Sequence, residues 1–133
     1  MDRKSKGLIA VFVTVLLAFA ACASQQPLVT IGPARGEIVL AMKASDFTFE
    51  PNNIKAYKDD VVVLKIENIS STGHNFTLKT PLGNAEQSVK LPPMETVTVK
   101  VELSEAGTYE FYCDKPFHST LGMKGQIVVT QGP

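Results

Sequence analysis

Apolar and polar residues alternate along most of the chain from Glu37 onward, and this period of two constrains the fold more than any other feature. Successive side chains of a β-strand point to opposite faces, so the alternation indicates strands with one buried face. The clearest sets are Ile38, Leu40 and Met42; Val62, Leu64 and Ile66; His74, Phe76 and Leu78; Val97, Val99, Val101 and Leu103; and Tyr109, Phe111 and Cys113. No segment shows a helical stripe, and Gly, Pro, Asn and Ser separate the runs. The sequence therefore predicts an all-β fold over residues 37–133, an antiparallel Greek-key β-sandwich or barrel of seven to eight strands.

The N-terminus has the pattern of a secretory signal peptide over residues 1–21. Three basic residues within Met1–Gly7 precede the apolar run Leu8–Ala21. This run is short for a transmembrane helix, and it lacks the polar face that a helix of the folded domain would need. The sequence therefore predicts an exported protein, located in the periplasm or at the cell surface.

Cys22 directly follows the apolar run, and two explanations for it are open. Phe19-Ala20-Ala21-Cys22 resembles a bacterial lipobox, in which the cysteine is lipidated and becomes the mature N-terminus. Alternatively, a signal peptidase cleaves after Ala23 and removes Cys22. We favour lipidation, because it accounts for a cysteine at this position and would anchor the domain to the membrane.

Residues 22–36 predict a flexible tether between the lipid anchor and the domain. Within Ser24–Gly36 there are two Gln, two Pro and two Gly, and no sustained periodicity. Such a composition is typical of a linker.

The charge balance of the mature chain argues against two classes of partner. Removal of residues 1–21 takes away three basic residues and one acidic residue, which leaves a formal charge near −2. No basic stripe indicates a nucleic-acid partner, and no acidic run indicates a calcium site.

One short loop, from Cys113 to Met123, combines a thiol, an imidazole and a thioether, with His118 in the middle. Cys113 has no disulfide partner, because Cys22 is the only other cysteine and lies in the lipidation motif. Sulfur and imidazole ligands together select copper, and His₂Cys with a weak axial Met is the blue-copper pattern. The second imidazole must come from His74, the only other histidine. The phase of each strand directs His74 and Cys113 into the core.

These motifs resemble the cupredoxins, the family of type 1 blue copper proteins. The resemblance rests on Gly73-His74-Asn75, on Cys113-x4-His118-x4-Met123 and on the Lys-Gly pair that follows. The loop spacing is closest to that of azurin and auracyanin, with plastocyanin further away. The resemblance implies one copper ion held by His74, Cys113 and His118, with Met123 as a long axial ligand. It also implies a weak contact from the Gly73 carbonyl.

Three further residues of the site have roles that the resemblance or the residue type implies. Asn75 either joins the two ligand segments by hydrogen bonds or satisfies its own strand end. Pro116 removes a backbone N–H near the thiolate, which should raise the reduction potential. Phe117 stands where many family members have Gly, and with Leu121 it either forms an apolar surface for docking redox partners or packs under the loop.

The expected function is one-electron transfer by a monomer that is not an enzyme. Its partners would be redox proteins of a respiratory or photosynthetic chain, together with the membrane that holds Cys22. The alternative is a copper-handling protein, a periplasmic chaperone or resistance protein without a role in electron transfer. Those proteins tend to use exposed Met and His clusters, whereas this chain has one closed set of four ligands. A Cys113–His118 nucleophile is disfavoured, because no further acid or orienting group accompanies the pair.

Overall fold

The computed structural model describes residues 26–132, so the signal peptide and Cys22 lie outside the described residues. Residues 26–132 form ten strands and no helix: β1 (Val29–Thr30), β2 (Glu37–Ser45), β3 (Thr48–Glu50), β4 (Asn53–Tyr57), β5 (Val61–Asn68), β6 (His74–Lys79), β7 (Ala85–Leu91), β8 (Thr96–Glu102), β9 (Gly107–Tyr112) and β10 (Lys124–Thr130). No helix in this part of the chain is long and apolar enough to cross a membrane.

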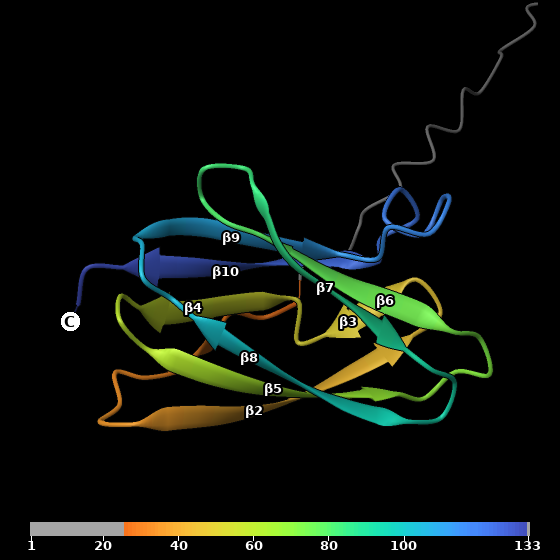
Figure 1. The fold of residues 1–133 in the computed structure, drawn as a ribbon, viewed down its shortest axis with the longest axis horizontal. Helices are drawn as coiled ribbons and strands as arrows, with labels where there is room; N and C mark the ends of the chain where they lie inside the picture. Colours follow the sequence, from red (N-terminus) through yellow and green to blue (C-terminus); the bar gives the residue numbers. More distant parts are fainter. Residues whose placement is uncertain (1–25, 133) are drawn as a thin grey trace, which may run out of the picture.

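The strands form two sheets that pack face to face (Figure 1). One sheet has the order β1-β4-β10-β9-β6-β7, and the other has the order β3-β2-β5-β8. Strand β9 returns to pair with β6 after β7 and β8, which is a Greek-key connection. The predicted all-β sandwich is therefore confirmed, with ten strands in place of seven to eight because β1 and β3 are only two and three residues long.

The sandwich is not purely antiparallel, which corrects the sequence-based prediction. Strand β2 pairs with β5 in parallel, and β4 pairs in parallel with both β10 and β1. Each parallel pair requires a connection that crosses between the sheets, since a tight hairpin can join only antiparallel neighbours. Alternation of side chains reports burial but carries no information on strand direction.

Residues 26–31 belong to the segment predicted to be a flexible tether, but in the structure they are held against the domain. Val29 and Thr30 pair with β4, and Ile31 is buried in the core. The side chain of Gln26 donates to the Phe49 carbonyl oxygen at 3.0 Å and accepts from the Asn52 main-chain N–H at 3.2 Å. Residues 26–31 therefore contact the folded domain.

The core between the sheets ends in an aromatic cluster beneath the loops. Phe49, Phe76 and Phe111 are fully buried, with ring centroids 5.3–5.8 Å apart. A Cβ at Gly125 would collide with the Phe111 ring and with the Asn52 carbonyl oxygen, so close packing requires glycine there. Phe76 and Phe111 lie two residues from His74 and Cys113. Their closely packed rings therefore restrict movement of the strand ends that carry these two residues.

Candidate metal centre

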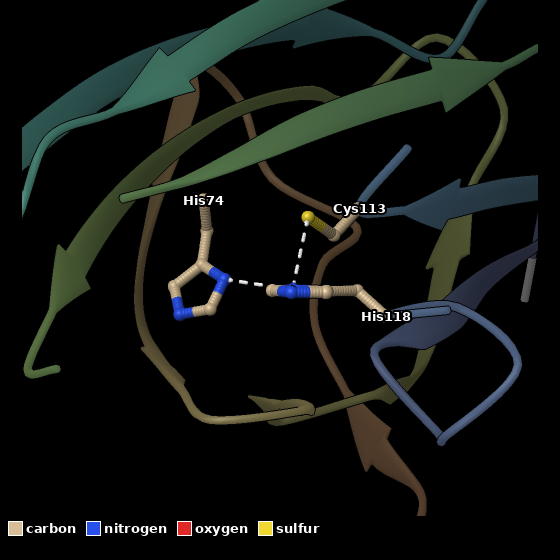
Figure 2. Close-up of side chains that lie close together, drawn as sticks. All are labelled: His74, Cys113 and His118. Atoms are coloured by element: carbon tan, nitrogen blue, oxygen red, sulfur yellow. Dashed lines mark hydrogen bonds between the residues drawn. The ribbon is translucent and has the colours of Figure 1, made fainter. Parts of the chain in front are cut away.

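Three potential ligand atoms meet at one end of the sandwich, from segments far apart in the sequence (Figure 2). The Nδ1 atoms of His74 and His118 are 3.2 Å apart, and Cys113 Sγ is 3.7 Å from His118 Nδ1. All three atoms lie within 4.8 Å of one another. His74 and Cys113 are buried and His118 is half-buried, so the first two point inward as strand phase predicted.

Backbone hydrogen bonds give the loop between β9 and β10 its shape. The Cys113 N–H donates to the Met123 carbonyl oxygen at 3.0 Å, and the Met123 N–H donates to the His118 carbonyl oxygen at 2.9 Å. Met123 is thus bonded through its main chain to both ligand residues of the loop. Its side chain is fully buried in the core that also encloses Cys113.

A polar cluster behind His74 determines which ring nitrogen faces the site. His74 Nε2 lies 2.9 Å from Ser70 Oγ. The single hydroxyl proton of Ser70 is already shared between two acceptors, Asn68 Oδ1 at 2.9 Å and the Thr72 carbonyl oxygen at 2.8 Å. Ser70 Oγ therefore accepts from His74, which requires the proton of the neutral imidazole to be on Nε2. The lone pair of Nδ1 is left free to bind a metal.

Asn68 hydrogen-bonds to Ser70 in this cluster and is itself fully buried. Its Nδ2 donates to the carbonyl oxygens of Thr72 and Leu91 at 2.9 and 3.0 Å. Its Oδ1 accepts from the Ser70 main-chain N–H at 3.1 Å. Sequence reasoning missed both Asn68 and Ser70, because at a strand end and in the loop that follows these residue types indicate only a turn.

The electrostatic environment keeps His74 neutral. Burial lowers the pKa of His74 below 6.5, the nearby His118 and Lys115 lower it further, and only Asp46 opposes them. The Asp46 carboxylate lies 3.7 Å from Nε2 but is exposed to solvent. A neutral imidazole at neutral pH is the form that binds a metal, so no proton must be displaced from His74.

Asn75 joins the two ligand segments. The Asp114 main-chain N–H donates to Asn75 Oδ1 at 2.8 Å, and Asn75 Nδ2 donates to the Asp114 carboxylate. Because Asn75 follows His74 and Asp114 follows Cys113, these bonds hold the two ligands in register.

The structure gives the Gly73 carbonyl oxygen a partner that the sequence did not suggest. The Lys115 ammonium donates a hydrogen bond to this oxygen. A contact between the Gly73 carbonyl oxygen and copper would therefore compete with the hydrogen bond from the Lys115 ammonium. Lys115 also places a positive charge beside the ligands.

Phe117 and Leu121 point outward, with exposed fractions of 76% and 61%. Phe117 does not pack under the loop, which contradicts that alternative. Pro116 is exposed as well. Phe47, which the sequence did not single out, lies edge-on to the His118 ring at a centroid distance of 5.0 Å.

Two imidazole nitrogens and one thiolate, with a buried thioether in the same loop, suit copper better than a hard cation. Fold and site together define a small β-sandwich protein with a soft-metal centre at one end. The family model of the cupredoxin-like domain matches residues 8–129, and the chain belongs to this family. The metal of the centre is one copper ion.

Similarity to individual proteins agrees with this assignment. Plastocyanin from Capsella bursa-pastoris is 29% identical over 101 residues, which cover 70% of this chain and 98% of the relative. The reduced auracyanin of Roseiflexus castenholzii has a TM-score of 0.62 at 17% identity, covering 69% of this chain and 96% of that one. Auracyanin A of Chloroflexus aurantiacus, a blue copper protein, has a TM-score of 0.61 at 22% identity, covering 71% and 100%.

Proposed function

We propose that this protein is an exported, membrane-tethered carrier of single electrons rather than an enzyme. Copper would supply the chemistry by alternating between Cu(I) and Cu(II). His74, Cys113 and His118 would be its strong ligands, and Met123 would be the weak axial one. The observation that carries the proposal is the grouping of three soft ligand atoms within 4.8 Å on a buried framework.

The framework supports electron transfer because the ligand atoms are already grouped. A trigonal N₂S set with a weak thioether suits both oxidation states of copper. The hydrogen bonds of Ser70, Asn75 and Met123 hold the ligands in place, so little movement should accompany each electron. A copper chaperone, in contrast, must release its metal readily, which an enclosed thiolate and imidazole would hinder.

Two parts of this proposal concern the surroundings of the domain. Lipidation of Cys22 would attach the protein to the membrane, and the exposed Phe117 and Leu121 would contact redox partners near the half-buried His118. Aromatic and aliphatic side chains exposed beside a redox centre favour brief contacts through apolar surface.

Absorption and voltammetry of the copper-loaded protein test the proposal. Wild type should show an intense thiolate-to-copper band and a reversible one-electron wave, and Cys113→Ser should lose the band. Cys22→Ala, which changes the other cysteine, should keep the band but lose palmitate labelling and membrane attachment. A colourless complex, or copper that cannot be reduced and reoxidised reversibly, would instead favour copper handling.

A further inference from the structure

Exposed apolar side chains gather on the loops at the copper end of the sandwich. Strands β2, β5, β7 and β9 all run toward this end (Figure 1). The loops that follow them carry five of the eight exposed large hydrophobic residues of the described chain. We call these five the copper-end surface: Phe47, Ile69, Met94, Phe117 and Leu121.

Three of these side chains stand on an unusual backbone conformation. Phe47, Met94 and Phe117 have φ values of 62°, 59° and 66°, in the left-handed region that favours glycine. A bulky residue there is strained, and such strained residues cluster at functional sites. Met94 and Phe117 are 71% and 76% exposed, so their side chains are available to a molecule outside the domain.

The contacts of Gln26 indicate what the copper-end surface faces. Gln26 makes four hydrogen bonds to the β3–β4 region, and it lines the same groove as Phe47 and Leu121. The chain therefore enters the domain beside the copper-end surface. Only four peptide bonds separate Gln26 from Cys22. Because a residue spans at most about 3.6 Å, Cys22 lies within roughly 14 Å of Gln26.

We propose that, between encounters with its redox partners, the copper-end surface rests on the lipid surface in which Cys22 is anchored, with Phe117 and Leu121 in contact with lipid. This inference rests on the proposed lipidation of Cys22. An anchor within roughly 14 Å prevents the copper end from moving far from the membrane. The copper centre would then lie at the membrane and not face the aqueous space.

Charge in these loops favours an apolar contact over attraction to anionic lipids. Asp46, Glu95 and Asp114 are balanced only by Lys115, so the loops are slightly acidic when the histidines are neutral. Protein surfaces that bind anionic lipids through charge carry clusters of basic residues instead. The contact should therefore form on zwitterionic lipid and depend little on salt.

A single-tryptophan experiment tests the orientation, because the chain contains no Trp. The lipidated, copper-loaded Phe117→Trp protein is reconstituted in phosphatidylcholine vesicles with and without bromine atoms near the headgroups. Leu82→Trp is the control, because Leu82 is 75% exposed and lies in the β6–β7 turn, at the opposite end of β6 from His74. We expect at least twofold quenching by bromine for Phe117→Trp and none for Leu82→Trp. The copper band shows that each variant retains its fold, and Leu121→Trp serves as a second probe.

The possible failures are distinguishable. Mass spectrometry of the mature chain that shows an unmodified Cys22 would overturn the lipid anchor of the proposed function, and this inference with it. Lipidated Cys22 with equal quenching of Phe117→Trp and Leu82→Trp would overturn only the inference. The copper-end surface would then be left to a protein partner.

Discussion

Replacement of Ser70 by alanine tests whether the cluster behind His74 holds the imidazole ready for copper. The Ser70→Ala change removes the acceptor 2.9 Å from His74 Nε2, in a cluster where both residues are buried. A buried donor left without an acceptor costs about 1–3 kcal/mol. The Asp46 carboxylate, 3.7 Å from Nε2, can partly replace the hydroxyl. We therefore expect the metal-free protein to lose about 1–2 kcal/mol of its free energy of unfolding.

The same variant should bind copper about 10- to 100-fold more weakly, because the partner that orients a ligating His typically contributes that much. Urea unfolding of the metal-free mature protein measures the first effect, and competition with a chelator measures the second. Ser71→Ala, at the exposed neighbouring position, is the matched control and should change neither. A loss below about 0.5 kcal/mol together with unchanged copper affinity would refute the role given to Ser70.

Three further predictions concern residues around the centre. Lys115→Met should lower the reduction potential measured by voltammetry by about 40 mV, since a neighbouring charge worth about 1 kcal/mol favours Cu(I), whereas Lys115→Arg should change it little. The metal-free protein should lose stability as the pH falls below 6.5, because the lowered pKa of His74 lets the unfolded chain bind a proton first; an equally steep pH dependence of urea unfolding in His74→Gln would contradict this. Phe117→Gly should raise the free energy of unfolding by up to about 1 kcal/mol by relieving the left-handed backbone strain, and a decrease would show that Phe117 stabilises the loop.

Much of the fold and the grouping of the histidines with Cys113 could be predicted from the sequence, because both follow from local patterns. Alternation defines buried faces, and the phase of a strand places His74 and Cys113 on them. The parallel pairing of β2 with β5 could not be predicted, since identical alternation suits either direction. Attachment of the N-terminal segment was also missed, because it depends on the two-residue strand β1, the buried Ile31 and the hydrogen bonds of Gln26, none of which forms a periodic pattern.

The residues that orient the ligands were the hardest to foresee. Asn68 and Ser70 act through contacts that only the assembled loops create. Lys115 reaches the Gly73 carbonyl because its long side chain crosses between two segments, and its spacing in the sequence contains no sign of this. Residue type and spacing identified the candidate ligands, whereas the groups that set their protonation and charge depended on three-dimensional packing.

A crystal structure of the copper-loaded protein tests the central claim most directly. The account predicts one copper ion bound by Nδ1 of His74, Nδ1 of His118 and Sγ of Cys113, with His74 Nε2 still bonded to Ser70 Oγ. The side-chain rotamers of His74 and Cys113 should be those seen here. Copper bound through Nε2, or at a place that does not involve Cys113, would contradict the account.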